Sequence, residues 1–229
     1  MADLIITIDG PAASGKSTVA RLLAKKLGVS FLDTGAMYRA VTLAAIENGV
    51  DMNDEQQLLD VLNNKEFRFV IKEGEMVTHI DGVDVSRRIR AHDVTINARH
   101  IAAWPRMRQK LVEMQRQFAE SQEKVVTEGR DQGTVVFPNA DIKFYLTADI
   151  TERARRRQAQ LANQGVNRDI EDIKRDLQER DKSDVTRKVA PLKPAHDAIV
   201  VDTTNLSIEK VVEKLFHLVE ERCLKKRCK

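Results

Sequence analysis

Short apolar runs alternate with segments of helical periodicity along most of the chain. The first run, LIITID at residues 4–9, is rich in β-branched residues, ends at Gly-Pro and is typical of a buried strand. Apolar residues then recur at helical spacing from Ser17 to Leu27, and Gly28 ends this predicted helix. Strands that alternate with helices favour an α/β fold, with a parallel sheet covered by helices on both faces.

The same pattern predicts the later elements of this alternation. Pro105 suits the first position of a helix, and Thr151 and Ser207 suit N-caps. Strands are expected at 29–35, 124–128, 141–148 and 197–203, and helices at 36–49, 105–121, 152–165, 170–181 and after Ser207.

Residues 62–100 have a different character. The stretch FRFVIKEGEMVTHIDGVDV alternates apolar and polar positions and carries turn signals at Glu73-Gly74 and Asp81-Gly82. This pattern predicts a small antiparallel β meander inserted into the α/β domain, and not another strand–helix–strand unit.

Composition agrees with one domain. The 229 residues are 42% apolar and 32% charged, which suits a single large α/β domain with a solvated surface. The formal net charge is only +3, so nothing demands a nucleic-acid partner. Arginines cluster at 87–90, 153–157 and 180–187, and guanidinium groups suit phosphate ligands.

Location and metal content can be predicted from other features. The apolar run at the N-terminus is too short for an export signal or a membrane span, so we expect no membrane association. The cysteines are Cys223 and Cys228, both in a basic tail, which suits the reducing cytoplasm. The five histidines lack zinc-ligand spacing, so we expect no metal site made by the protein alone.

The segment GPAASGKST fits the phosphate-loop pattern G-x-x-x-x-G-K-[ST] and lies between a predicted strand and a predicted helix. Lys16 is expected to reach the β and γ phosphates of ATP, and the Ser17 hydroxyl to help bind Mg²⁺. The alternative is an ordinary glycine-rich turn with an exposed lysine. The expected phosphate-binding residues are Gly10, Pro11, Ala12, Ala13, Ser14, Gly15, Lys16, Ser17 and Thr18.

This loop by itself does not distinguish a kinase from a switch or a motor. The chain lacks the N-K-x-D that specifies guanine in GTPases. The strand VVTEGRD ends in acidic residues, but Arg130 separates Glu128 from Asp131. That arrangement favours a ligand-binding loop over a simple magnesium carboxylate.

Three further segments could bind a phosphorylated acceptor. DTGAMYR offers the hydroxyls of Thr34 and Tyr38 and the guanidinium of Arg39, although it could merely begin a helix with Arg39 in solvent. WPRMR offers Arg108, which could also lie on a solvated helix face. EGRDQG offers Arg130 beside Asp131, a pair that could equally be structural.

A basic helix could close over the transferred phosphate. Arg153, Arg156 and Arg157 share one helical face and Arg155 lies off it, although a solvated basic helix is the alternative. Arginines in a lid stabilise the charge that phosphoryl transfer spreads over the γ-phosphate, and a closed lid excludes water. We expect Lys16, Arg153 and Arg157 to be catalytic. No general base is needed, because an acceptor phosphate is already ionised near neutral pH.

The ordered set GPAASGKST, DTGAMYRAVTLAA, EGRDQGTVVFPNADIKFYLTA, ERARRR and VAPLKPAHDAIVVDTT resembles the bacterial cytidylate kinases, members of the nucleoside monophosphate kinases with a phosphate loop. The resemblance covers almost the whole chain. It implies one P-loop kinase domain over 1–229, with 62–100 as the acceptor-binding insertion and 152–168 as a helical lid. It also implies ATP, Mg²⁺ and CMP or dCMP as ligands, and a monomer.

The resemblance implies a role for each matching acceptor residue. A cytosine offers an amine to an aspartate and accepts hydrogen bonds from an arginine, whereas uracil would leave both groups mismatched. The implied set is Thr34 and Tyr38 beside the acceptor, Arg39 and Arg130 on its phosphate, Arg108 and Asp131 on cytosine, and Arg180, Asp184 and Arg187 on its sugar and phosphate.

Some positions depart from the pattern or leave alternatives open. Family members often carry a small hydroxyl residue before the proline-started helix, where this chain has Arg99 and His100. The residues that contact adenine and the role of Arg155 are not predicted. A kinase for UMP, AMP or shikimate, a nucleotide-gated switch that uses the basic tail, and a structural protein with a vestigial loop are the other readings of the sequence.

Overall fold

A computed structural model describes residues 2–163 and 165–227, and the chain forms two compact units. The first unit comprises residues 1–3 and 29–125, and the second comprises 4–28 and 126–229. The strands of the larger, mostly parallel sheet follow the order β2-β6-β1-β7-β8. This order confirms the predicted α/β class with β1, the strand before the phosphate loop, at the centre of the sheet.

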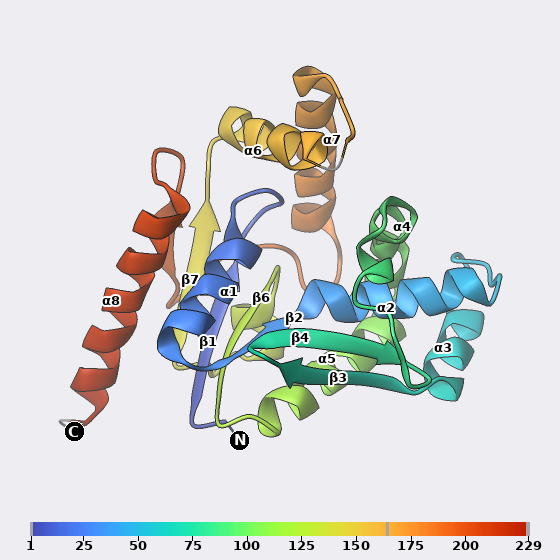
Figure 1. Ribbon diagram of the computed structural model, residues 1–229, viewed down its shortest axis with the longest axis horizontal. Helices are drawn as coiled ribbons and strands as arrows, with labels where there is room; N and C mark the ends of the chain where they lie inside the picture. Colours follow the sequence, from blue (N-terminus) through green and yellow to red (C-terminus); the bar gives the residue numbers. More distant parts are fainter. Residues whose placement is uncertain (1, 164, 228–229) are drawn as a thin grey trace. The chain divides into compact units, whose positions relative to one another are not determined.

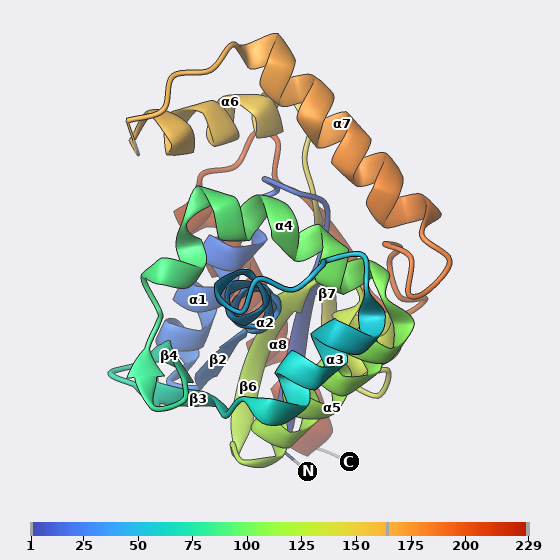
Figure 2. The same cartoon turned by 90° about the vertical axis from the view of Figure 1, so that its right-hand side faces the viewer.

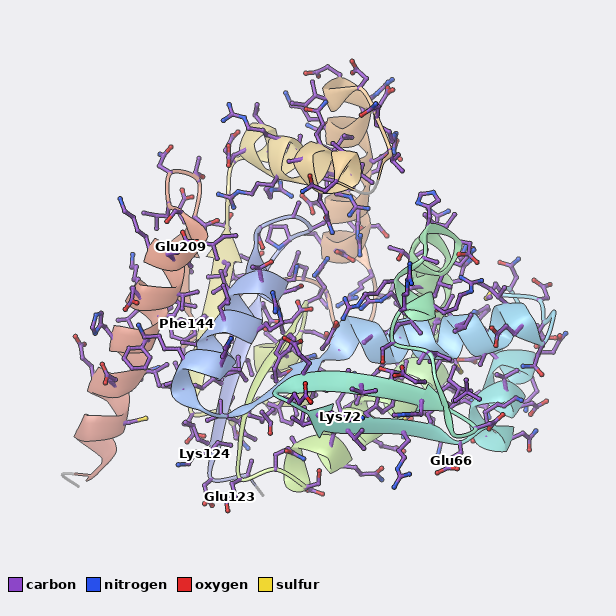
Figure 3. The ribbon with its side chains drawn as sticks, in the orientation of Figure 1. Glu66, Lys72, Glu123, Lys124, Phe144 and Glu209 are labelled. Atoms are coloured by element: carbon purple, nitrogen blue, oxygen red, sulfur yellow. The ribbon has the colours of Figure 1, made fainter. Side chains whose placement is uncertain are left out.

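The second unit is built on β1 (Leu4–Asp9), β6 (Lys124–Gly129), β7 (Ile142–Thr147) and β8 (Ile199–Asp202). β7 pairs in parallel with both β1 and β8, and Ile8 lies opposite the fully buried Phe144, which is labelled in Figure 3. Helices α1 (Lys16–Leu27) and α8 (Ile208–Arg227) pack side by side against this part of the sheet (Figure 1).

Two helices of the second unit form a separate layer of their own. α6 (Ile150–Ala162) and α7 (Ile170–Thr186) lie side by side in Figure 2. Their shared apolar core also includes Ala12 of the phosphate loop. The predicted Thr151 cap is wrong: the helix begins at Ile150, two residues earlier than predicted. Asp149 is therefore the N-cap, and its carboxylate accepts a hydrogen bond from the Thr151 amide.

The first unit is mainly helical. Its strand β2 (Ser30–Asp33) leads into α2 (Thr34–Glu47), whose Val41, Leu43 and Ala45 are fully buried. The other helices are α3 (Glu55–Asn64), the short 3-10 turn η1 (Arg88–Arg90), α4 (His92–Ala103) and α5 (Pro105–Glu120). Pro105 stands at the first position of α5, as predicted.

A small antiparallel sheet belongs to the first unit. It contains β3 (Phe67–Lys72), β4 (Glu75–Ile80) and β5 (Val83–Asp84), joined by tight turns in which Glu73, Gly74, Asp81 and Gly82 all have positive φ. Figure 3 labels Glu66, which directly precedes β3, and Lys72, its last residue. The predicted meander is therefore confirmed over 67–84, with its two turns at the predicted turn signals.

The meander does not fill the whole of 62–100. Residues 62–64 end helix α3, and α4 occupies 92–103. The helix α3 has a sequence signal in Asp54, whose side chain caps the amides of Gln56 and Gln57. By contrast, α4 has no side-chain cap and buries only Val94 and Ile101, so its helical period is faint.

The structure also concerns the predictions about membrane association and the two cysteines. Within 2–163 and 165–227, no helix combines the length and the apolar character needed to cross a bilayer. Cys223 is a free thiol on α8, and Cys228 lies outside the described residues.

Candidate active site

The loop between β1 and α1 has the backbone expected of a phosphate-binding loop. Gly10 has a φ of 153°, and a Cβ atom there would lie 2.1 Å from the Leu146 carbonyl oxygen, so only glycine fits. Ala13 and Gly15 also have positive φ, at 59° and 88°. Helix α1 begins directly afterwards at Lys16, so the N–H groups of its first turn lie at the end of the loop. The segment therefore has the strand–loop–helix context that the motif requires.

Lys16 is folded into this loop and buried. Its Nζ donates a hydrogen bond to the Pro11 carbonyl at 3.0 Å, and only 5% of the residue is exposed. Burial lowers the pKa of the Lys16 ammonium to about 7. The nearby Ser14 hydroxyl is also buried and has no hydrogen-bond partner among the described residues. The loop thus holds a buried cation and a buried hydroxyl, two groups that can donate hydrogen bonds to an oxyanion.

Other charges of the second unit surround Lys16. The guanidinium groups of Arg130 and Arg180 reinforce the lowering of its pKa, whereas the carboxylates of Glu128 and Asp184 oppose it. Burial, together with Arg130, also lowers the pKa of Arg180 to about 10. The fold therefore gathers Lys16 with three of the residues predicted for the acceptor, although they lie more than 110 positions away in the sequence.

The predicted acceptor residues of the second unit form ion pairs. Arg130 Nε donates to Asp184 Oδ2 at 2.8 Å, and both side chains are largely buried. Although burial raises it, the Arg130 guanidinium brings the pKa of Asp184 below its ordinary value. Asp131 Oδ1 lies 3.7 Å from an Arg187 guanidinium nitrogen. The segment after β6 and the C-terminal part of α7 are thus joined by charge.

The arginines of α6 have different partners. Arg153 is buried and donates to the Ala12 carbonyl of the phosphate loop at 3.2 Å and to Asp181 of α7 at 2.5 Å. Arg157 donates to Gln160 at 2.8 Å on the partly exposed face. Arg155 is 74% exposed, as expected for a residue off the shared face. In this structure Arg153 joins helices α6 and α7 to the phosphate loop.

Arg156 connects α6 with two loops of the second unit. It donates to the Thr203 carbonyl at 2.6 Å and to Thr203 Oγ1 at 3.0 Å, and it lies 3.5 Å from the Ser14 carbonyl. Thr203 Oγ1 also donates toward the Ser14 carbonyl at 3.2 Å. Arg156 is therefore a link between the phosphate loop and the turn at 203–205.

The first unit holds the remaining predicted acceptor residues. Thr34 and Arg108 are buried, at 4% exposure each, and Tyr38 is half-buried. Asp33 caps α2 by accepting from the Ala36 amide, as the simple helix-start interpretation expected. Arg39, however, is not in solvent: it pairs with Asp33 at 3.2 Å, and among the described residues its Nε has no hydrogen-bond partner.

Comparison with known proteins identifies the family. A family model described as cytidylate kinase matches residues 6–221. The chain belongs to the cytidylate kinase family. It is 42% identical over 217 residues to the curated cytidylate kinase of Lactobacillus gasseri, covering 95% of this chain and 94% of that protein. It is 45% identical over 217 residues to the cytidylate kinase of Geobacillus sp. strain WCH70, covering 95% and 96%.

Similarity to solved structures is weaker. Shikimate kinase from Acinetobacter baumannii, solved in complex with shikimate, superposes with a TM-score of 0.48 at 17% identity. That alignment covers 95% of this chain and 93% of that chain. The membership in the cytidylate kinase family rests on the sequence matches. Its consequence is that the chain is a phosphotransferase of the nucleotide kinase type.

Three charged residues of this cytidylate kinase family member were missed as site candidates. Glu128 is buried and close enough to Lys16 to affect its pKa. Arg90 pairs with Asp33 at 3.3 Å, so it shares the carboxylate that Arg39 contacts. Asp9 is buried at the end of β1. Glu128 belongs to the EGRDQG segment and Arg90 to the arginine cluster at 87–90. The only sequence signal for Asp9 was its place at the end of the apolar run LIITID.

Proposed function

We propose that this chain transfers the γ-phosphoryl group of ATP to CMP or dCMP, giving ADP and CDP or dCDP. The observation that carries the proposal is the charge cluster around Lys16, in which Arg130, Arg180 and Asp184 act on the same ammonium group. The donor phosphate and the acceptor phosphate must meet for an in-line transfer. A shared cluster of donor and acceptor residues is what such a reaction requires.

On the donor side, ATP would bind along Gly10–Thr18. The positive φ angles turn the backbone N–H groups of the loop toward one anion, and Lys16 would leave the Pro11 carbonyl for the β and γ phosphates. Ser17, exposed in the first turn of α1, offers a hard oxygen ligand that suits Mg²⁺. Bound with ATP, Mg²⁺ would neutralise part of the phosphate charge.

On the acceptor side, Arg39 and Arg130 would bind the phosphate of CMP. The Arg39 Nε, which has no hydrogen-bond partner in the described part of the chain, is a donor oriented by its ion pair with Asp33, and it suits an incoming oxyanion. Thr34 and Tyr38 would contribute hydroxyls, and Arg180, Asp184 and Arg187 would contact the sugar and the phosphate.

Arg108 and Asp131 would recognise the cytosine. Asp131 would accept from the amine of the base, and Arg108, buried on α5, would donate to its ring acceptors. A uracil would set a carbonyl oxygen against the Asp131 carboxylate, which leaves buried polar groups unpaired. CMP and dCMP carry the same base, so both are proposed as acceptors.

The lid would stabilise the transition state. Arg153 and Arg157 are proposed to meet the transferring phosphoryl group when residues 152–168 close over it, with Gln164 of this segment outside the described residues. Closure would also exclude water, which would otherwise compete with CMP. The lid and the acceptor-binding insertion at 62–100 are proposed as subregions of one P-loop kinase domain spanning 1–229.

The proposal also includes the partners, the oligomeric state and the location of the enzyme. Its partners would be the small-molecule nucleotides ATP, CMP and dCMP, with no nucleic acid or membrane partner, and it would act as a monomer in the cytoplasm, where these nucleotides are found.

The test measures ADP after incubation of the protein with ATP and Mg²⁺ and with each of CMP, dCMP, UMP and AMP. Acceptor-dependent ADP with the cytosine nucleotides is expected. Turnover with UMP or AMP but not with CMP would contradict the acceptor, and ADP formation that no acceptor stimulates would favour a nucleotide switch.

A substitution separates the two halves of the site. Asp131→Ala should nearly abolish turnover of CMP while ATP binding, measured by calorimetry, is retained, because the changed residue meets the base. Loss of ATP binding as well would assign Asp131 to the donor side or to structure. Arg155→Ala is the matched control, since that side chain is 74% exposed and should leave both quantities unchanged.

A further inference from the structure

Asp9 connects the strand before the phosphate loop with the segment that carries Arg130 and Asp131. It is the last residue of β1 and only 4% exposed. Its Oδ1 accepts a hydrogen bond from the Gln132 amide at 2.9 Å, and its Oδ2 accepts one from the Gly133 amide at 2.8 Å. Both carboxylate oxygens are thus used by successive backbone amides from a segment more than 120 positions away.

These two amides begin a π-helical turn, η2 (Gln132–Val136). The turn is closed by hydrogen bonds from the Val136 amide to the Asp131 carbonyl and from the Phe137 amide to the Gln132 carbonyl. The first amides of any helical turn lack an acceptor inside the turn. An aspartate just before the turn normally caps them with its own side chain.

Here the aspartate just before the turn is Asp131, and its side chain does not cap η2. Asp9 supplies the cap from β1 instead. The Asp131 Oδ1 atom lies 3.7 Å from an Arg187 guanidinium nitrogen. The local sequence would therefore assign these amides to Asp131, whereas in the structure Asp9 accepts their hydrogen bonds.

We infer that Asp9 is a positioning residue: by capping η2 in place of Asp131, it sets the direction of the Asp131 carboxylate for the base of the acceptor nucleotide. This inference rests on the proposed function, because it assigns Asp131 to base recognition. Asp9 itself acts through Asp131 and does not touch the acceptor.

The surrounding packing supports a fixed turn. A Cβ atom at Gly133 would lie 2.9 Å from Thr7 Oγ1 of β1 and 3.1 Å from the Lys143 side chain of β7. The Gln132 side chain is held by the Thr127 hydroxyl, which donates to it at 2.9 Å. Because Asp131 directly precedes this closely packed turn, loss of the Asp9 contacts at Gln132 and Gly133 would change the direction of Asp131.

The experiment compares Asp9→Asn with Asp141→Asn. The first variant keeps the size of the side chain but places an NH₂ group against one of the two amides. The second is a matched control, because Asp141 Oδ2 accepts from the Ile5 amide at 2.8 Å, at the other end of the same strand. Each folded variant is assayed for kcat and KM with CMP and with UMP, and for the dissociation constant of ATP.

The inference predicts a loss confined to the acceptor. Asp9→Asn should lower kcat/KM for CMP by roughly 10²-fold, because the base-recognising carboxylate is misplaced, and it should reduce the preference for CMP over UMP. The dissociation constant of ATP should change by less than about threefold, and Asp141→Asn should resemble the unmodified protein. An unchanged CMP-to-UMP ratio, or an equal loss for donor and acceptor, would overturn the inference.

Two further measurements test the inference if Asp9→Asn does not fold or if the unmodified protein shows no CMP turnover. If Asp9→Asn does not fold, Gly133→Ala displaces the same turn, and the same acceptor-selective loss is expected; equal donor and acceptor losses would overturn the inference. If the unmodified protein shows no CMP turnover, the proposed function fails. The positioning of η2 is then judged by hydrogen exchange at Gln132 and Gly133, which should be faster in Asp9→Asn than in Asp141→Asn, and equal exchange would overturn it.

Discussion

Binding of ATP should be accompanied by uptake of a proton on Lys16. Burial lowers the pKa of this ammonium from 10.5 to about 7 in the protein without nucleotide. That shift corresponds to a penalty of roughly 5 kcal/mol for keeping the charge in the loop. Triphosphate oxygens beside Nζ favour the charged form, so ATP should restore a high pKa.

The magnitude of the effect follows from this difference. At pH 7 about half of the protein molecules carry a neutral Lys16, and at pH 8 about nine-tenths do. Binding of one ATP should therefore be accompanied by uptake of about 0.5 proton at pH 7 and about 0.9 proton at pH 8. The sign is that the affinity for ATP falls as the pH rises above the pKa of the free protein. Between pH 7 and pH 9 the association constant should fall roughly 50-fold.

Calorimetry measures this uptake directly. ATP is titrated in the presence of Mg²⁺ in buffers of different ionisation enthalpy, and the slope of the observed enthalpy gives the number of protons. Lys16→Met is the control, and its weaker binding should show no uptake from this group. An affinity that is constant between pH 7 and pH 9, with no proton uptake at pH 8, would refute the reasoning.

Three other changes have defined outcomes. Gly10→Ala should lower the free energy of unfolding by about 3 kcal/mol or more in urea, because the new Cβ atom would meet the Leu146 carbonyl, whereas Gly28→Ala, with a φ of 68° and no atom nearby, should cost about 1–2 kcal/mol. Equal losses would contradict the clash. Arg156→Lys should raise KM for ATP about tenfold and leave KM for CMP unchanged, because the fork onto Thr203 is lost; a matching rise for CMP would count against this role. Burial raises the pKa of Asp9 from 3.8 to about 6, so between these values the folded chain holds a proton that the unfolded chain has released, and this carboxyl makes the protein less stable as the pH rises. The free energy of unfolding of Asp9→Asn relative to the unmodified protein should therefore rise by about 2 kcal/mol from pH 4 to pH 7 in urea titrations, and a constant difference would contradict the shift.

Elements with a strong local period were predictable from the sequence. The helix α1 ends at Gly28, whose amide donates back to the last turn with a φ of 68°, and glycine is the residue that tolerates this geometry. β1 and β7 were visible as short apolar runs because both are buried in the sheet. Their signals depend only on neighbouring residues.

Elements with a weak local signal were not predictable. Helix α4 exposes Ile96 to solvent and has no capping side chain, so tertiary packing of two residues, Val94 and Ile101, holds it in place. The π-helical turn η2 follows the Arg130-Asp131 segment, which was predicted only as a ligand-binding loop. Its amides are held by Asp9, and no local pattern contains that contact.

In the candidate site, too, a contiguous motif was predictable from the sequence, whereas contacts between distant residues were not. The phosphate loop is one contiguous motif, and its glycines have the backbone angles that the motif demands. The pairing of Arg130 with Asp184 joins residues 54 positions apart and required the fold. The contacts of Arg153 with the Ala12 carbonyl and Asp181 were equally hidden, because a helical period shows which face a side chain occupies and not which partner it meets.

The most direct measurement follows the transferred phosphate itself. The protein is incubated with Mg²⁺, CMP and ATP labelled in its γ-phosphate, and the labelled products are separated and identified. The account predicts that the label moves into CDP. Label found in inorganic phosphate alone, or in a product of UMP or AMP when these are supplied together with CMP, would contradict it.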